Sequence, residues 1–220
     1  MDFKRYSELF HYGVKGMHWG IRRYQNVDGT LTPLGKKRKR ETVFVSGSSK
    51  TQFEDSGYYR KDLPKDVRKK INEYIKNGDK IIVGDAPGID RQVQDYLKKK
   101  RYKNVEVYGP GNKQVRYSAN KKWKTKLIDA PEFEENSPEW LAKKDKAMTK
   151  VATKGLSIVL DDGSMATKRN VARLLSQHKN VDVYELNKEY NKDHFVDEQY
   201  IQNMLNMLDQ VDRKKNKHLY

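Results

Sequence analysis

The sequence predicts an α/β fold built on a doubly wound, mostly parallel, Rossmann-like sheet with helices on both faces. Short apolar runs alternate along the chain with segments of helical periodicity. Each apolar run is continuous rather than alternating, which is typical of parallel strands buried on both faces. Right-handed crossovers between such strands generate the doubly wound arrangement.

Five strands are expected, each ending at a turn signal or at a helix. They cover residues 42–47, 80–84, 105–109, 156–160 and 181–186. Pro64 opens the first helix of the domain and Gly78 closes it, whereas Ser137 caps a later one that begins at Pro138. Residues 110–137 are basic and aromatic and predict a long loop. A final amphipathic helix is expected near residues 196–213.

Three segments follow from these patterns. Residues 1–41 form a basic, Gly-rich N-terminal arm of poor periodicity, residues 42–187 form the Rossmann-like domain, and residues 188–220 hold the C-terminal helix and tail. The first forty residues carry ten Lys or Arg and three Asp or Glu. We expect this arm to be extended or partly disordered, with turns at Asp28-Gly29 and Pro33.

Composition limits the classes of function. A formal net charge of +16 favours contact with nucleic acid or another polyanion, although a lysine-rich solvated surface explains it equally well. The chain has no cysteine, which excludes disulfides and thiolate metal sites. No apolar run approaches the roughly 18 residues of a membrane span, and no signal-peptide pattern is present, so we expect a cytoplasmic protein without a membrane partner.

Three of the predicted strands end in small or acidic residues. The exits read VSGSS at 45–49, VGDAPGID at 83–90 and LDDGSMAT at 160–167. Small residues let backbone N–H groups approach an anion, and the following helix adds the positive end of its dipole. One such turn alone is more often structural, but three at the same edge of a sheet favour a ligand site.

Other kinds of site find little support. The Rossmann GxGxxG and Walker A patterns are absent, and so is the nucleophile elbow GxSxG. No two of the five histidines lie four residues apart on a helix, so no metal site is expected.

The segments IIVGDAPGIDRQVQDYL and KKDKAMTKVATKGLSIVLDDGSMATKRNVARLLSQHKNVDVYEL resemble the SLOG superfamily. This Rossmann-like group contains the LOG nucleotide hydrolases, the DNA-processing protein DprA and the YspA/YpsA-related proteins, and the last are the most similar. The resemblance implies binding of a nucleotide or an NAD-derived ligand at the carboxyl edge of the sheet. The ligand-binding residues that it implies, with neighbouring hydroxyl groups, are Gly47, Ser48, Ser49, Gly84, Asp85, Gly88, Asp90, Lys144, Asp145, Gly163, Ser164 and Thr167.

One departure from the LOG pattern bears on catalysis. LOG hydrolases carry a GGxGTxxE-type motif, whereas this chain has GSMATKRN, with Asn170 in place of the glutamate. An amide cannot act as a carboxylate base. Catalytic residues are therefore not assigned, and N-glycosidic hydrolysis remains an alternative to simple binding.

The arm carries a second resemblance. HYGVKGMHWGIRRYQNVDGTLTPLGKKR is similar to a segment of tailed-phage and prophage proteins, some of them minor head or structural proteins. The resemblance implies docking to a phage particle or partner through residues such as His11, Trp19, Arg22 and Arg23. Nucleic-acid contact and a nonspecific basic tail are the alternatives.

These features together predict a phage- or prophage-encoded accessory protein. Its SLOG-like domain would bind a nucleotide-type ligand, and its arm would attach it to a virion or another partner. The alternatives are a DNA- or RNA-binding protein and a nucleotide-processing enzyme. Homodimer formation is left open.

Overall fold

The computed structural model describes residues 26, 28, 30, 32–36 and 40–217. It divides into two compact units, Met1–Arg40 and Glu41–Tyr220. In the first unit, Asp28 Oδ1 accepts hydrogen bonds from the backbone N–H and the hydroxyl of Thr30, which forms the expected turn. Pro33 does not form the second expected turn, because it begins the short helix α2 (Pro33–Lys36).

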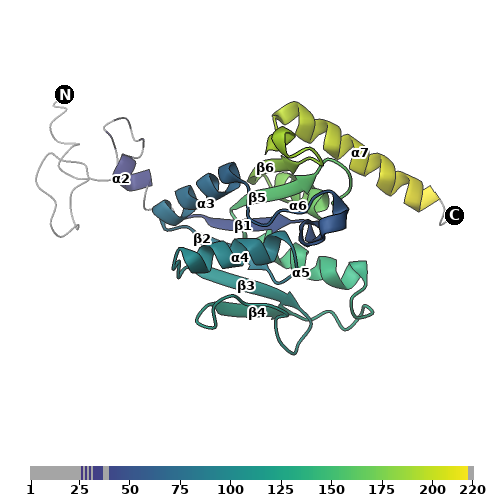
Figure 1. Cartoon of the computed structure of the whole chain (residues 1–220), viewed down its shortest axis with the longest axis horizontal. Helices are drawn as coiled ribbons and strands as arrows, with labels where there is room; N and C mark the ends of the chain where they lie inside the picture. The colour runs from purple at the N-terminus through teal and green to yellow at the C-terminus, as the bar shows by residue number, and fades with distance from the viewer. Residues whose placement is uncertain (1–25, 27, 29, 31, 37–39, 218–220) are drawn as a thin grey trace, which may run out of the picture. The chain divides into compact units, whose positions relative to one another are not determined.

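The second unit is built on one sheet of seven strands (Figure 1). Their order is β4-β3-β2-β1-β5-β6-β7, and every pair is parallel except the last. The strands are β1 (Thr42–Gly47), β2 (Lys80–Gly84), β3 (Val105–Pro110), β4 (Lys124–Ile128), β5 (Lys154–Leu160), β6 (Asn180–Leu186) and β7 (His194–Phe195). The prediction of an α/β fold with a mostly parallel sheet is confirmed.

The predicted number of five strands is wrong, because both edges of the sheet carry a further strand. The first, β4, lies within residues 110–137, which were expected to form a loop. Its three leading residues are exposed, so it lacks the continuous apolar run that marks a central strand. The second, β7, has only two residues, both exposed, and pairs antiparallel with β6. Short, polar edge strands of this kind limit edge-to-edge aggregation.

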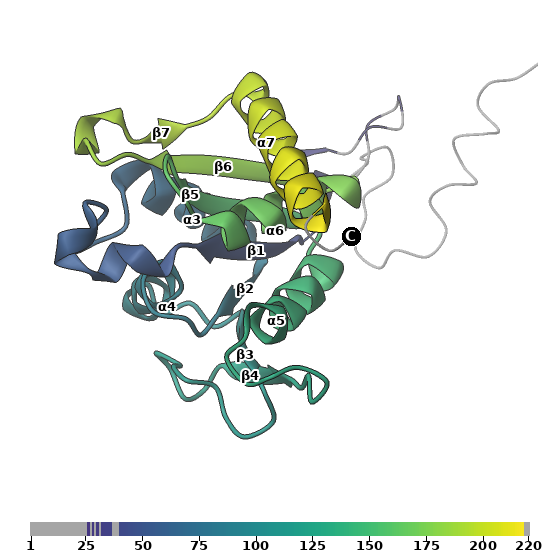
Figure 2. The ribbon, with the colours of Figure 1, turned by 90° about the vertical axis from the view of Figure 1, so that its right-hand side faces the viewer.

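Helices cover both faces of the sheet (Figure 2). On one face lie α3 (Lys65–Asn77) and α4 (Ile89–Lys99), and on the other α5 (Pro138–Val151), α6 (Met165–Ser176) and α7 (Glu198–Lys217). Alternate residues of a strand pack into the hydrophobic cores on the two faces of the sheet. Val43 and Val45 pack with the α3 and α4 side, whereas Phe44 packs against Met148 of α5. The sheet is therefore buried on both faces, as doubly wound folds require.

Two of the expected helix caps agree with the structure. Gly78 follows α3 in the left-handed conformation at φ 75°, and its backbone N–H bonds to the last turn. Ser137 caps α5 by accepting a hydrogen bond from the backbone N–H of Trp140 at 3.2 Å.

The strand order places a topological switch point between β1 and β5. From β1 the chain moves outward through β2, β3 and β4, then crosses back through α5 to β5 on the other side of β1. Ligand crevices of open α/β sheets lie beyond the carboxyl ends of the strands at such a point. In this protein, the loops after β1 and β5 border that position.

Candidate functional site

A cleft of about 470 Å³, here called the switch-point cleft, lies at the carboxyl ends of the central strands. The loops after β1, β2 and β5 contribute to it, together with α5 and the first turns of α6. Its lining residues are Phe44, Ser46, Gly47, Ser48, Ser49, Lys50, Ala86, Pro87, Asp90, Arg116, Leu141, Lys144, Asp145, Ser164, Met165, Ala166, Thr167 and Asn170.

The structure brings most of the sequence-predicted ligand residues to this cleft. Eight of the twelve line it, namely Gly47, Ser48, Ser49, Asp90, Lys144, Asp145, Ser164 and Thr167. Gly84, Asp85, Gly88 and Gly163 do not line it.

The glycines outside the lining allow close approaches behind it. A Cβ on Gly84 would overlap Asp90 Oδ2 and lie 2.7 Å from Lys144 Nζ, so the missing side chain makes room for this charged pair. Gly88 has φ 79°, and a Cβ there would lie 2.5 Å from the carbonyl oxygen of Ser48. The β1 and β2 loops therefore pack backbone against backbone.

Asp85 positions a residue that the sequence did not single out. Its fully buried carboxylate accepts hydrogen bonds from the backbone N–H of Arg116 at 2.8 Å and from the guanidinium of Arg116 at 2.6 Å. Arg116 lines the cleft, and its side chain is 40% exposed. Asp85 thus holds a cation at the border of the cleft instead of facing a ligand.

Two buried charged side chains, Lys144 and Asp90, lie together with the half-buried Asp145 in the lining of the cleft. Lys144 Nζ lies 3.1 Å from Asp145 Oδ1, and Asp90 lies beside them over Gly84. Burial raises the pKa of Asp90 to about 7, against the lowering effect of Lys144 and with further raising by Asp145 and Asp85. Burial alone would lower the pKa of Lys144, but the charges of these three carboxylates raise it above its ordinary value.

Asn170, on α6, holds a neighbouring carboxylate. Its amide donates to Asp145 Oδ2 at 2.9 Å, and its own oxygen accepts from the guanidinium of Arg173 at 2.6 Å. Asp145 is therefore fixed by Lys144 on one oxygen and by Asn170 on the other. This arrangement can orient a hydroxyl-bearing ligand. The Asn170 side chain is an amide and supplies no carboxylate of its own.

The start of α6 also lines the cleft. Ser164, the residue before the helix, adopts the left-handed conformation at φ 55° and makes no side-chain cap. Its Oγ is buried without a hydrogen-bond partner among the described residues. The first turn of α6 holds no acidic residue. Lys50 also reaches this point, since a Cβ built on Gly163 would lie 3.3 Å from its Nζ.

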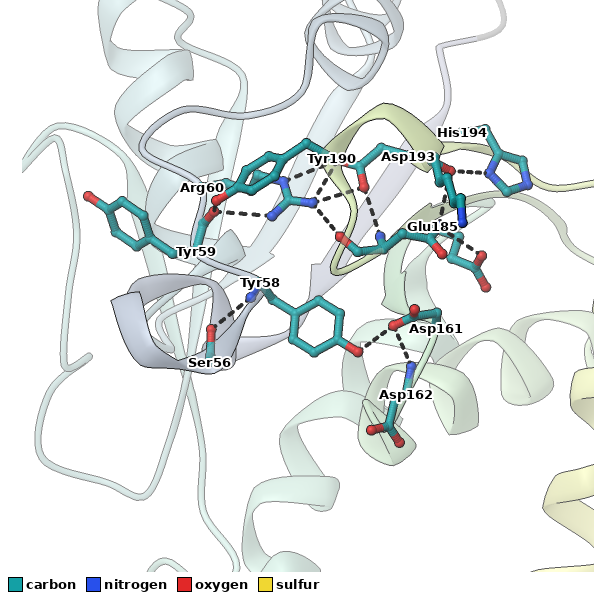
Figure 3. Close-up of polar contacts among 12 residues, drawn as sticks. Ser56, Tyr58, Tyr59, Arg60, Asp161, Asp162, Glu185, Tyr190, Asp193 and His194 are labelled. Atoms are coloured by element: carbon teal, nitrogen blue, oxygen red, sulfur yellow. Dashed lines mark hydrogen bonds and ion pairs between the residues drawn. The ribbon is translucent and has the colours of Figure 1, made fainter.

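The long loop after β1 is tied to the exit of β5 (Figure 3). Tyr58, further along this loop, donates a hydrogen bond from its hydroxyl to Asp161, which lies at the exit of β5. The loop after β1 and the loop after β5 are therefore joined to each other by a contact outside the lining of the cleft.

Sequence reasoning missed several lining residues. Lys50 directly follows the VSGSS exit, so this exit could have pointed to it as a ligand residue. Arg116 lies in a loop with no motif of its own. Ala86, Pro87, Leu141 and Met165 add apolar surface. Of these, Ala86 and Pro87 belong to the VGDAPGID exit that the sequence analysis assigned to a ligand site.

The described residues contain neither a metal site nor a membrane span. No group of three or more His, Cys, Asp or Glu side chains among them is placed to hold a metal ion. No helix in the described part of the chain is long and apolar enough to cross a membrane.

A comparison with known protein families matches part of the arm. Residues 6–26 match a family of unknown function, DUF7211. No curated protein sequence matches the chain. The matched segment contains His11, Trp19, Arg22 and Arg23, the predicted docking residues, and all four lie outside the described residues. The unit that carries the cleft has no part in the match.

Proposed function

We propose that the Glu41–Tyr220 unit binds a nucleotide or an NAD-derived nucleotide in the switch-point cleft. The observation that carries the proposal is the uncapped start of α6, where the buried Ser164 hydroxyl has no hydrogen-bond partner among the described residues and the Lys50 ammonium group lies close by. A phosphate at this point would accept hydrogen bonds from the hydroxyl and from the free backbone N–H groups of the first helical turn. It would also meet the positive charge of Lys50 and the helix dipole.

The rest of the cleft suits the sugar and base of such a ligand. Asp145 and Asp90 offer carboxylate oxygens for ribose hydroxyls, and Leu141 and Met165 offer apolar surface for a base. The resemblance to the SLOG superfamily supports the same ligand class. In this proposal the unit senses or sequesters the nucleotide, because Asn170 supplies no carboxylate for cleavage of an N-glycosidic bond.

The arm completes the proposal. Its resemblance to segments of phage head-associated proteins supports attachment to a phage particle or another partner. The protein would then act as a phage- or prophage-encoded accessory protein in the host cytoplasm or on the virion.

The test is a thermal-shift screen of the full chain with nucleoside monophosphates, NAD, ADP-ribose and cyclic nucleotides. We expect one ligand class to stabilise the wild type. Ser164→Gly relieves a left-handed serine and should stabilise the free protein by up to about 1 kcal/mol, yet weaken ligand binding about tenfold or more through loss of a hydrogen bond to a charged group. Lys50→Ala should weaken binding as well.

The controls are Ser176→Gly at the other end of α6 and Lys76→Ala on α3. Neither residue lines the cleft, so both variants should keep the affinity of the wild type. No ligand-induced shift with any member of the panel, or equal losses in the cleft and control variants, would count against the proposal.

A second candidate, binding of nucleic acid, is favoured by one observation. Two basic segments meet at the edge of the sheet, because the indole N–H of Trp123 donates to the carbonyl of Tyr102 at 2.9 Å. Nine exposed cations lie on these segments, and none of them is in an ion pair within the described part of the chain. They are Lys98, Lys99, Lys100, Arg101, Lys103, Lys121, Lys122, Lys124 and Lys126.

Such a patch would bind phosphate backbones through release of counterions. We expect Lys121→Glu combined with Lys124→Glu to weaken the binding of a duplex oligonucleotide and to flatten its dependence on salt. The same exchange at Lys65 and Lys69 of α3 serves as the control. Equal loss in the two variants would point to general charge attraction and not to this surface.

A further inference from the structure

A second hollow of about 480 Å³ lies beside the switch-point cleft, at the carboxyl ends of β3 and β4. Arg116 lines both spaces. Helix α5 also borders both, since Trp140 faces the second hollow while Leu141, Lys144 and Asp145 face the first. The two hollows are therefore neighbours with a shared border.

The guanidinium of Arg116 at this border is held in place, but only part of its hydrogen-bonding capacity is taken up by the described residues. Its Nη2 bonds to the buried carboxylate of Asp85, and among the described residues its Nε and Nη1 have no hydrogen-bond partner. A guanidinium fixed in this way presents a planar pair of donors, the geometry that recognises phosphate oxygens.

The second hollow has the side chains of a nucleobase site. Phe133 is 37% exposed and offers a ring face for stacking, and Trp140 forms part of the buried wall. Gly111, at φ 84°, brings the backbone so close to the indole that a Cβ would lie 3.0 Å from Trp140 Cζ2. Three amide side chains that can pair with the polar edge of a base complete the lining, namely Asn112, Gln114 and Asn136.

Size separates this site from one for a mononucleotide. Small-molecule pockets measure about 300–1,000 Å³. Each hollow alone falls in the lower half of that range, and the two together approach its upper end. One small nucleotide would leave one of them empty.

We propose that the two hollows hold a single dinucleotide-type ligand, with two ribosyl ends joined by a diphosphate. The diphosphate lies in the switch-point cleft between the start of α6 and Arg116. One end stays in that cleft, and the other passes Arg116 so that its base stacks on Phe133. This assignment rests on the proposed nucleotide binding and adds the class of nucleotide.

The experiment is titration calorimetry of the full chain with AMP, ADP-ribose and NAD. We expect at least one diphosphate-linked ligand to bind ten times more tightly than AMP or better. Phe133→Ala should weaken the binding of that ligand about fivefold or more, as expected for loss of a stacked base, and leave the affinity for AMP unchanged. Phe53→Ala is the matched control, since Phe53 is 51% exposed and lines neither hollow.

The outcomes separate this inference from the proposed function. Equal affinities for AMP and the diphosphate-linked ligands, or an equal effect of Phe133→Ala on both, would overturn the second base site while nucleotide binding stands. Failure of every nucleotide to bind would overturn both proposals.

Discussion

Asp90 is the residue whose surroundings conflict most with its charge. It lies in the first turn of α4 with 6% of its surface exposed, and among the described residues its carboxylate accepts one hydrogen bond, from the backbone N–H of Ala86 at 3.4 Å. Burial raises its pKa to about 7, although Lys144 opposes the rise. Near neutral pH the carboxyl group is therefore part protonated, and the charge of the cleft wall changes with it.

The raised pKa gives the stability of the protein a defined dependence on pH. Because the folded form keeps the Asp90 proton up to about pH 7 while the unfolded chain loses it near its ordinary value, this group makes the free energy of unfolding fall between about pH 4 and pH 7. Asp90→Asn, which resembles the protonated acid, should remove that fall and stabilise the protein above pH 7 by about 1 kcal/mol or more.

Urea unfolding at several pH values measures the effect. Asp62→Asn, at an exposed position outside the cleft, should keep the pH dependence of the wild type. A parallel decline in Asp90→Asn and wild type would show that other groups cause it. Lys144 does not titrate in this range, since its pKa lies above its ordinary value.

At the scale of elements, the loop after β1 depends on a buried ion pair. Arg60 donates from Nε and Nη2 to Asp193, with Nη2 2.9 Å from Asp193 Oδ1, and also bonds to the carbonyl of Asn187. Its guanidinium stacks 3.7 Å from the ring centre of Tyr190 (Figure 3). The loop that lines the cleft is thereby fixed to the segment between β6 and β7.

Loss of this pair should be costly. Arg60→Ala leaves the buried carboxylate of Asp193 without its cation, and we expect a loss of about 3–5 kcal/mol in the free energy of unfolding. Lys192→Ala breaks the neighbouring exposed pair with Glu189 and should cost less than about 1 kcal/mol. Urea unfolding of both variants tests the difference. Similar losses would mean that the loop is held by other contacts.

The elements also show which parts of the fold can be read from the sequence. The central strands and the helices that cover them were predictable because each buries a regular apolar pattern, and α3 and α5 also have recognisable caps at Gly78 and Ser137. Strand β4 was not, because the sequence KTKLI places its polar residues at a sheet edge, where no apolar run is required. Strand β7 has two residues, too few for any periodic pattern.

The position of the cleft, at the scale of the whole molecule, was predictable for a related reason. Parallel strands bring their carboxyl ends to one edge, so the exits after β1, β2 and β5 had to gather there. The direction of each side chain was not predictable. The Asp85 carboxylate bonds to Arg116, which lies 31 positions away in the sequence. Only tertiary packing determines this contact.

At the same scale, we predict that the stability of the Glu41–Tyr220 unit does not depend on residues 1–40. Every hydrophobic core cluster of the described residues draws on the chain between Val43 and Leu205, and the buried Leu208 extends this core. A chain that begins at Glu41 should therefore unfold in one cooperative transition, with a Tm within about 2–4 °C of the full chain, the shift that corresponds to 1 kcal/mol.

Calorimetry of the two chains provides the measurement, and Leu208→Ala in the shorter chain shows that it detects damage to the core. That variant should lose about 2–5 kcal/mol. A larger fall in Tm on removal of residues 1–40 would show that the arm contributes to folding. An unchanged Tm with unchanged nucleotide affinity would instead leave the arm, with its ten basic residues, free to act on a separate partner.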